Sequence, residues 1–281
     1  MTILVTGAPG WLGNRLVEEL LHHREKVRCL VLPGLNATVL HEQGAEIVYG
    51  DITDSTSLHH VCKGVDTIIH AAGVIHPRRV KDFYRINTEG TKNLLEAATK
   101  NKVNKFIYIS SNSAQGCNTS RQELMKEGHQ EHPEKNYGKS KRLAEEAVQD
   151  CYNRGLFKTV ILRPCWFYGP GQPDRMTKLM HMIKEGRPIL FGDGKNLRSM
   201  SYVDNIIQAI ILAEHSSEAN GKTYWIADEQ PYTTFAIYQE IARQLGVALC
   251  PRYVPAFVST CFELVDDLFQ AVGLYNINFH V

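Results

Sequence analysis

The sequence predicts an α/β protein with a doubly wound parallel sheet and a smaller C-terminal lobe. In the first half, short apolar runs alternate with amphipathic segments, which is the order that builds parallel strands joined by helices. The apolar runs are continuous, as in strands buried on both faces. After Arg163, loops containing proline and glycine replace this alternation and mark a change of architecture.

The composition is that of a globular protein, because 43% of the 281 residues are hydrophobic and 22% are charged. A formal net charge of +1 argues against a broad nucleic-acid surface. The sequence contains no run of about 18 apolar residues that could span a membrane. It also opens directly into a predicted strand without a signal peptide, so we expect a cytoplasmic protein. Seven cysteines without CxxC spacing predict reduced thiols, and twelve histidines without HExxH spacing predict no metal site.

Six strands are expected in the first part of the chain. They cover residues 3–5, 27–32, 46–49, 66–70, 105–110 and 159–162. Helices are expected between them, over residues 11–21, 55–62, 82–100 and 137–152. The first helix illustrates the pattern, because Leu12, Leu16 and Leu20 recur on one helical face.

The C-terminal part is expected to be a lobe over residues 164–281, partly interleaved with a first domain over residues 1–163. Its predicted elements are helices over 174–185, 203–214, 233–245 and 257–272, and strands over 188–191 and 222–226. The last helix has a broad apolar face, which we expect to pack on the lobe or on a partner subunit. Its acidic residues disfavour an anionic membrane surface. The final residues 276–281 suggest a chain that is incomplete at its C-terminus.

The segment Thr6–Gly13 carries three glycines between the first strand and the first helix. Glycine permits a tight turn and lets backbone N–H groups approach a pyrophosphate, which the positive end of the helix also attracts. This context predicts a Rossmann-type dinucleotide site. The contacts expected from this turn are Gly7, Pro9, Gly10, Trp11, Leu12 and Gly13.

The residues at the end of the second predicted strand do not indicate whether the cofactor is NAD or NADP. An acidic residue there would bind the ribose hydroxyls of NAD, and a basic one would favour the 2′-phosphate of NADP. The chain has Val31 and Leu32 at this place, and we expect Arg28 to point elsewhere, so the choice stays open. Asp51 and Ile52 are placed to flank the adenine, although Asp51 could equally cap a helix.

Tyr137 and Lys141 are four residues apart on a predicted helix, so both side chains lie on one face. A phenol with a pKa near 10 is a poor base at neutral pH. A neighbouring ammonium stabilises the phenolate and lowers that pKa. Ser111 precedes the tyrosine by 26 residues and completes a candidate proton-transfer set.

With the glycine turn, Ser111 and Tyr137/Lys141 in this order, the sequence resembles the extended short-chain dehydrogenase/reductase family. It is most similar to the epimerase/dehydratase and 3β-hydroxysteroid dehydrogenase branches. Further matching motifs are His70-Ala71-Ala72-Gly73, Asn87-Thr88-Glu89-Gly90-Thr91, Ser110–Gly116, Arg163-Pro164, Tyr168–Gly171, Gly192–Arg198 and Tyr202–Asn205.

This resemblance implies a catalytic role for three residues. Ser111 would orient the reacting oxygen, Tyr137 would exchange the proton, and Lys141 would tune Tyr137 and bind the nicotinamide ribose. The remaining cofactor contacts it implies are Leu32, Asp51, Ile52, Ala71, Ala72, Gly73, Asn87, Lys141 and Pro164.

Departures from the family pattern bear on the reaction. Asn112 and Ser113 stand where sugar dehydratases carry an acidic pair, so dehydration is disfavoured. Trp166 replaces an asparagine of many nucleotide-sugar epimerases and favours an apolar or ring-shaped ligand. Arg198 stands where such enzymes bind nucleotide phosphates, with an ordinary salt bridge as the equal alternative. Asn112, Trp166 and Arg198 are the candidate substrate contacts.

The predicted function is therefore an NAD(P)-dependent oxidoreductase that acts on a secondary alcohol or ketone of a small molecule. A nucleotide-sugar epimerase using the same Ser/Tyr/Lys site is the first alternative. A non-catalytic dinucleotide-sensing protein is the second, although such relatives typically lack the tyrosine that this chain retains. The resemblance also implies a homodimer formed through the helices over 82–100 and 137–152.

Overall fold

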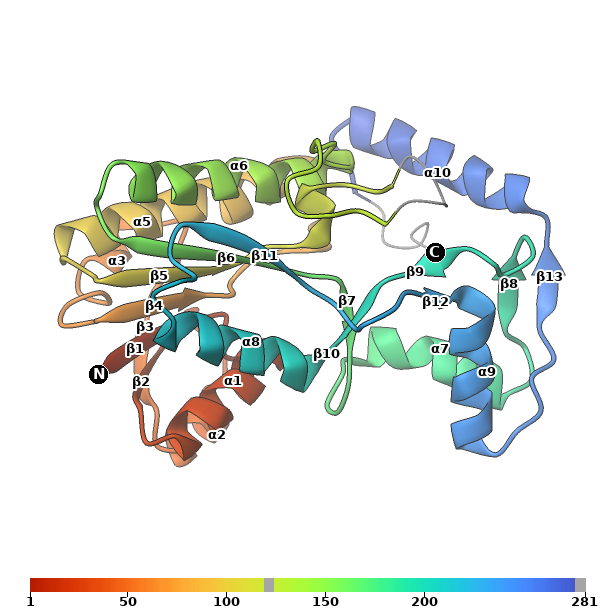
Figure 1. Cartoon of the computed structure of the whole chain (residues 1–281), viewed down its shortest axis with the longest axis horizontal. Helices are drawn as coiled ribbons and strands as arrows, with labels where there is room; N and C mark the ends of the chain where they lie inside the picture. Colours follow the sequence, from red (N-terminus) through yellow and green to blue (C-terminus); the bar gives the residue numbers. More distant parts are fainter. Residues whose placement is uncertain (119–123, 276–281) are drawn as a thin grey trace.

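A seven-stranded sheet forms the centre of the computed structural model (Figure 1), which describes residues 1–118 and 124–275. All neighbouring strands are parallel, in the order β11-β6-β5-β4-β1-β2-β3. The strands are β1 (Thr2–Thr6), β2 (Lys26–Val31), β3 (Glu46–Tyr49), β4 (Thr67–His70), β5 (Lys105–Ile109), β6 (Lys158–Pro164) and β11 (Lys222–Ile226). The chain order reverses between β1 and β4, which is where open α/β sheets bind their ligands.

Helices cover both faces of this sheet, so the predicted doubly wound fold is confirmed. One face carries α1 (Trp11–His22), α2 (Thr38–Glu42) and α8 (Val203–His215); the other carries α3 (Ser55–Leu58), α5 (Gly90–Lys100) and α6 (Lys135–Asn153). Helix α8 and strand β11 lie beyond residue 163 in the chain, yet they pack onto the sheet. The C-terminal part thus builds some of the lobe, returns to the sheet with α8 and β11, and then completes the lobe.

The predicted helix over 82–100 is confirmed as a continuous helical segment, but its first half is not regular α-helix. Residues there form α4 (Val80–Asp82) and a π-helical segment, η1 (Phe83–Glu89), before α5 begins. The wider turn accompanies two hydrogen bonds between Asn87 and Val74 after β4: the Asn87 amide donates to the Val74 carbonyl, and its Oδ1 accepts the Val74 N–H. The predicted helix over 55–62 is also shorter, since α3 ends at Leu58.

The lobe lies beside the carboxyl edge of the sheet (Figure 1) and contains small elements. Its helices are α7 (Asp174–Lys184), α9 (Thr234–Leu245) and α10 (Ala256–Ala271). Its strands pair two by two: β7 (Trp166–Tyr168) with β10 (Met200–Tyr202), β8 (Ile189–Phe191) with β13 (Arg252–Val254), and β9 (Leu197–Arg198) with β12 (Tyr232–Thr233). The predicted end of the chain, residues 276–281, lies outside the described residues.

Candidate active site

The glycine turn packs tightly against the chain that follows β4. Gly7 has a φ of +74°, and a Cβ at this position would lie 2.8 Å from the backbone of Ala71 and Ala72. A Cβ at Gly13 would lie 2.2 Å from the carbonyl oxygen of Gly7. The N–H of Gly10 donates to that same carbonyl at 2.9 Å and closes the turn. Only glycine therefore fits at positions 7 and 13, and the backbone at the start of α1 stays open to an anion.

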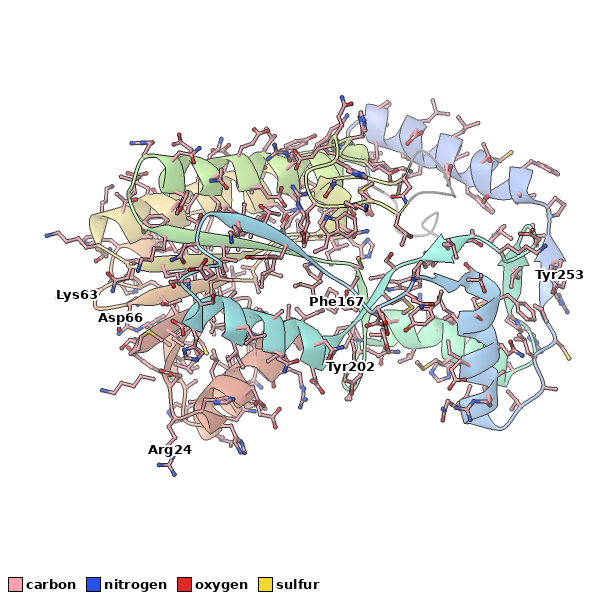
Figure 2. The ribbon with its side chains drawn as sticks, viewed as in Figure 1. Arg24, Lys63, Asp66, Phe167, Tyr202 and Tyr253 are labelled. Carbon is pink, nitrogen blue, oxygen red and sulfur yellow. The ribbon has the colours of Figure 1, made fainter. Side chains whose placement is uncertain are left out.

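The other residues of this turn differ in their surroundings. Leu12 is buried in the core, so only its backbone faces the turn, and Pro9 is half-buried. Trp11 points toward the lobe. Its indole N–H donates to the carbonyl of Pro170 at 2.7 Å, and its ring stacks on Phe167 at 5.1 Å. Figure 2 shows Phe167 at the junction between sheet and lobe. Trp11 therefore links the glycine turn to the lobe.

The carboxyl ends of β2 and β3 offer few charged groups. Leu32 is exposed after β2. Arg28 points away, since its guanidinium donates to Glu46 and to the carbonyls of Val61 and Lys63. The carboxylate of Asp51 accepts the N–H of Thr53 and stabilises its own turn, while the cap of α3 is Asp54. Ile52 is buried, and a Cβ at Gly90 would lie 2.8 Å from its side chain.

Lys141 is buried and fixed to the sheet. Its Nζ donates to the carbonyl of Ile109 at 2.8 Å and lies 4.3 Å from the centre of the Tyr108 ring. Burial lowers the pKa of Lys141 to about 7, against the opposing charge of Glu145. A Cβ at Gly73 would lie 4.0 Å from this Nζ, so that glycine leaves space beside the ammonium.

Ser111 and Tyr137 are brought together by a close approach of two segments. Ser111 follows β5 and caps the short helix η2 (Asn112–Ala114), with its Oγ accepting the N–H of Ser113 at 3.2 Å. A Cβ at Gly138 would lie 2.2 Å from the carbonyl of Ser113, so α6 touches this turn directly beside Tyr137. The ring of Tyr137 lies 5.9 Å from that of Phe83. Tyr137, Lys141 and the Ser111 turn thus share one region at the carboxyl edge of the sheet.

The candidate substrate residues divide between the sheet edge and the lobe. Asn112 follows Ser111, and its Oδ1 lies 3.4 Å from the serine Oγ. Trp166 is exposed at the start of β7, and the guanidinium of Arg198 lies over its ring at 5.0 Å. Burial lowers the pKa of Arg198, with Tyr238 and Cys117 opposing this. Pro164 is buried at the end of β6, two residues before Trp166.

A buried histidine that the sequence did not single out for chemistry connects the site. Thr91 donates to the carbonyl of Asn87, so its hydroxyl accepts from Nε2 of His70 at 2.9 Å. Nδ1 of His70 then accepts from Thr6 at 2.6 Å, and Thr6 accepts the N–H of Ala72. Burial lowers the pKa of His70 to about 3, with Lys141 adding to the effect, so the ring is neutral. This chain ties the glycine turn to Asn87.

Arg163 is a second residue whose role was missed. Its guanidinium donates to both carboxylate oxygens of Glu145 on α6, and also to Gln115 and Glu131. Burial would lower the pKa of Arg163, but the hydrogen bonds and charges of Glu145 and Glu131 outweigh this and raise it. A charged residue inside an apolar run was the available signal. The network fixes α6, Gln115 and Glu131 against β6.

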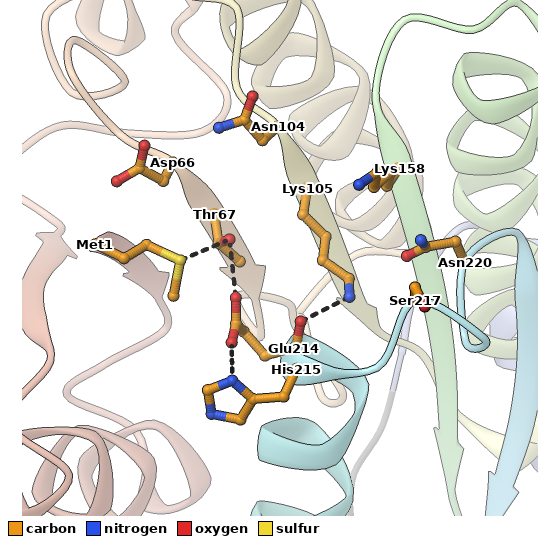
Figure 3. Close-up of a pocket in the computed structure, with 10 residues that line it drawn as sticks. All are labelled: Met1, Asp66, Thr67, Asn104, Lys105, Lys158, Glu214, His215, Ser217 and Asn220. Carbon is orange, nitrogen blue, oxygen red and sulfur yellow. Dashed lines mark hydrogen bonds and ion pairs between the residues drawn. The ribbon is translucent and has the colours of Figure 1, made fainter.

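A pocket lies at the opposite, amino-terminal edge of the sheet (Figure 3). Its walls include Asp66, Lys105 and Lys158 at the starts of strands, and Glu214 at the end of α8. The Nζ of Lys105 donates to the carbonyls of Glu214 and Ser216, which caps α8. These contacts stabilise the fold at a place remote from the glycine turn.

Within residues 1–118 and 124–275, no helix combines the length and apolar character needed to cross a bilayer. In the same part of the chain, no group of three His, Cys, Asp or Glu side chains could hold a metal ion. The candidate chemistry of the site region therefore consists of the glycine turn and the Ser111, Tyr137 and Lys141 side chains.

The fold and this region define an extended short-chain dehydrogenase/reductase of the Rossmann type. Residues 4–254 match the model of the 3-beta hydroxysteroid dehydrogenase/isomerase family. The chain belongs to this family, and the predicted class of NAD(P)-dependent oxidoreductase or epimerase is confirmed at that level.

Individual relatives show how wide the family is. An uncharacterized protein of Sinorhizobium fredii is 37% identical over 99% of this chain and 84% of its own length. The UDP-glucose 4-epimerase of Vibrio cholerae is 29% identical over 95% of this chain and 82% of its own. Among solved structures, a double mutant of the dTDP-glucose 4,6-dehydratase DesIV from Streptomyces venezuelae, with NAD bound, is 25% identical. It covers 91% of this chain and 84% of its own, with a TM-score of 0.78.

Proposed function

We propose that the protein interconverts a secondary alcohol and a ketone by hydride transfer, with Ser111, Tyr137 and Lys141 as its working residues. The observation that carries this proposal is the buried ammonium of Lys141, held by the carbonyl of Ile109 one helical turn from Tyr137. An ammonium at that place favours the phenolate, and so lets Tyr137 act as a base near neutral pH.

Tyr137, Ser111 and Lys141 have different roles in this reaction. Tyr137 takes the hydroxyl proton during oxidation and returns it to the ketone oxygen during reduction. The Ser111 hydroxyl donates a hydrogen bond to the reacting oxygen and holds it beside the phenol. Lys141 stabilises the phenolate and binds a ribose hydroxyl. When bound, the nicotinamide accepts or supplies the hydride.

The chain's own residues fit a dinucleotide, and NAD is proposed over NADP. The glycine turn offers open backbone at the start of α1, and Gly73 leaves space beside Lys141. Arg28 is occupied with Glu46, and residues 29–62 contain neither Lys nor Arg to meet a 2′-phosphate. Leu32, Asp51 and Ile52 would surround the adenosine, and Ala71, Ala72, Asn87 and Pro164 the rest of the cofactor. Mass spectrometry of the dinucleotide released from purified protein tests this choice, and copurified NADP would overturn it.

An epimerase is the second candidate, since the Vibrio cholerae relative is a UDP-glucose 4-epimerase. Arg198 stacked on Trp166 supports a ligand with both a ring and an anionic group. Dehydration is disfavoured because Asn112 and Ser113 cannot protonate a leaving hydroxyl as a carboxylic acid does. We propose that residues 164–281 supply the substrate site, apart from α8 and β11, which pack on the sheet.

The test combines two probe substrates with one variant. UDP-glucose and a 3β-hydroxysteroid are each incubated with NAD⁺, while absorbance of the reduced nicotinamide and conversion of UDP-glucose to UDP-galactose are followed. Net NADH formation identifies a dehydrogenase, and sugar conversion without it identifies an epimerase. Tyr137→Phe should lower turnover about 1,000-fold while NAD still binds. Full turnover in Tyr137→Phe would remove this residue from the mechanism.

We also propose a cytoplasmic homodimer that associates through α5 and α6. Leu143 is an exposed apolar residue on α6, and all seven cysteines are free thiols, as expected in a reducing compartment. Light scattering after gel filtration should give a dimer mass, and Leu143→Arg should shift it toward a monomer. Leu212→Arg, at an exposed leucine of α8, is the matched control and should leave the mass unchanged.

A further inference from the structure

Helix α10 contacts the two residues that precede Tyr137. The Nζ of Lys135 lies 2.8 Å from Oδ2 of Asp266 and 3.5 Å from the carboxylate of Asp267. The side-chain amide of Asn136 donates to Gln270 at 2.7 Å, and Gln270 donates to Asp266 at the same distance. Figure 1 shows α10 beside the start of α6. Two consecutive residues of the first turn of α6 are therefore held from one distant helix.

The most deeply buried residues of α10 are polar. Its buried residues are Asp266 and Gln270, with Asp266 only 1% exposed. Phe257, Leu264 and Leu268 are 66%, 59% and 69% exposed. A buried carboxylate is stable only when it is paired and hydrogen-bonded. The contact between α10 and α6 therefore includes a buried ion pair with Lys135, beside half-buried apolar residues such as Val265 and Phe269.

Lys135 has a strained backbone at the start of α6. Its φ is +47°, in the left-handed region that costs a residue with a Cβ about 1–2 kcal/mol. Such a conformation persists only where the surroundings impose it. The carboxylates of α10 bind the Lys135 side chain, and although burial lowers the pKa of Lys135, their hydrogen bonds and charges raise it overall. The contacts with α10 thus hold Lys135, the residue at which α6 begins.

The chain beyond α10 reaches Tyr137 by a second path. The N–H of Val80 donates to the carbonyl of Gly273, and that of Tyr275 donates to the carbonyl of Arg78. The ring of Tyr275 packs edge-on against Phe83 at 5.0 Å, and Phe83 in turn lies 5.9 Å from Tyr137. Residues 266–275 therefore reach the surroundings of Tyr137 by two routes, through Lys135 and Asn136 and through Phe83.

We propose that residues 266–275 form a clamp that sets the position of Tyr137 relative to Lys141 and Ser111, with Asp266 as its central positioning residue. Lys141 is fixed independently, because its ammonium is bound to Ile109 of β5. The distance between phenol and ammonium then depends on how α10 holds the first turn of α6. The clamp lies outside residues 4–254, the part that matches the family model. The proposal rests on the proposed function of Tyr137.

The first test replaces the carboxylate with its neutral isostere. Asp266→Asn should lower kcat for the wild-type enzyme's better probe, UDP-glucose or a 3β-hydroxysteroid with NAD⁺, about 10-fold or more. The KM and the dissociation constant of NAD should change less than twofold. Glu263→Gln makes the same chemical change at an exposed site on the same helix and should behave as wild type.

A double variant separates positioning from stability. Lys135→Met alone leaves the buried carboxylate of Asp266 without its cation and should lower the melting temperature. Lys135→Met combined with Asp266→Asn removes both charges and should recover that stability, while kcat stays low. Recovery of kcat together with stability would overturn the clamp. Lys135→Arg retains the ion pair and should keep at least half of the wild-type kcat.

Amide hydrogen exchange gives a readout that does not depend on activity. In Asp266→Asn, exchange over residues 134–141 should rise at least fivefold, while exchange over residues 143–153 of the same helix should not change. Unchanged exchange over 134–141 would overturn the clamp, as would a wild-type kcat in Asp266→Asn beside an inactive Tyr137→Phe. Full turnover in Tyr137→Phe would instead overturn the proposed function, and with it any catalytic role of the clamp.

Discussion

Helices α1 and α10 are both amphipathic, yet they are held in opposite ways. Helix α1 buries Leu12, Leu16, Val17 and Leu20 against the sheet. Helix α10 buries Asp266 and Gln270 and leaves Phe257, Leu264 and Leu268 exposed. Apolar burial is additive and insensitive to direction, whereas a buried ion pair depends on geometry. The sheet half is therefore stabilised by its core, and the C-terminal helix is placed by a few specific contacts.

The largest predicted effect lies in the glycine turn of the sheet half. Gly13→Ala places a methyl group 2.2 Å from the carbonyl oxygen of Gly7, and neither backbone can move without separating β1 from α1. We expect a loss of about 4 kcal/mol or more in the free energy of unfolding. Affinity for NAD should fall at least 100-fold. Chemical denaturation and isothermal titration calorimetry measure the two effects.

A glycine of the lobe supplies the control. Gly186 has a φ of +68° but open space around it, so Gly186→Ala should cost only the strain of a left-handed residue, about 1 kcal/mol. NAD affinity should not change. Equal losses in the two variants would show that steric contact at Gly13 does not maintain the turn.

The second largest predicted effect is on stability, and it compares a leucine of α1 with a leucine of α10. Leu16→Ala empties a fully buried site in α1 and should cost about 3 kcal/mol. Leu268→Ala removes an exposed side chain of α10 and should change stability by less than about 0.5 kcal/mol. Urea denaturation of both variants checks the difference. A large loss in Leu268→Ala would mean that the outer face of α10 is covered, for example by the partner subunit expected from its broad apolar face.

The difference between the sheet half and the lobe also explains which helices and strands can be predicted from the sequence. The strands of the sheet are continuous apolar runs, and each helix on it has a periodic apolar face, so their order and approximate bounds follow from pattern alone. The strand pairs of the lobe are two or three residues long and carry no period, which is why β7, β9, β10, β12 and β13 were not predicted. Helix α2 buries only Leu40 and gives equally little signal.

Some residues of the candidate site can be recognised from the sequence, and others only from the folded structure. Gly7, Gly13, Tyr137 and Lys141 are recognisable because their residue types and spacing are demanded by local geometry. The relation of Asp266 to Lys135 spans 131 residues, and only the folded chain reveals it. The π-helical turn at Asn87 is hidden for the same reason, since its hydrogen bonds go to Val74 in another loop.

The third effect concerns the buried ammonium, where function and stability should oppose each other. Burial lowers the pKa of Lys141 from 10.5 to about 7, so the folded state disfavours its charge. Below pH 7 both states are protonated and this destabilisation is complete. Between pH 7 and 10.5 only the unfolded state holds the proton, so wild-type stability rises with pH. Lys141→Met should therefore raise the melting temperature by about 4 °C at pH 6 and abolish turnover.

The advantage of Lys141→Met should shrink steadily above pH 7 and vanish near pH 10.5. Melting curves by circular dichroism across this range measure it. A variant that is less stable than wild type at pH 6 would show that the hydrogen bond to Ile109 outweighs the desolvation of the ammonium.

The smallest effect lies where the two regions meet. Trp11 belongs to the glycine turn, but its indole N–H donates to Pro170 and its ring stacks on Phe167. Trp11→Phe keeps an aromatic stack and removes one hydrogen bond, so it should cost about 1 kcal/mol of stability. If the turn and the lobe close on the cofactor together, the same variant should weaken NAD binding about fivefold, which corresponds to that energy.

Phe167→Leu removes the stack but leaves the hydrogen bond of Trp11. An equal loss of NAD affinity in both variants would show that the junction, and not the turn alone, contributes to cofactor binding. Unchanged affinity in both would confine NAD recognition to the sheet half.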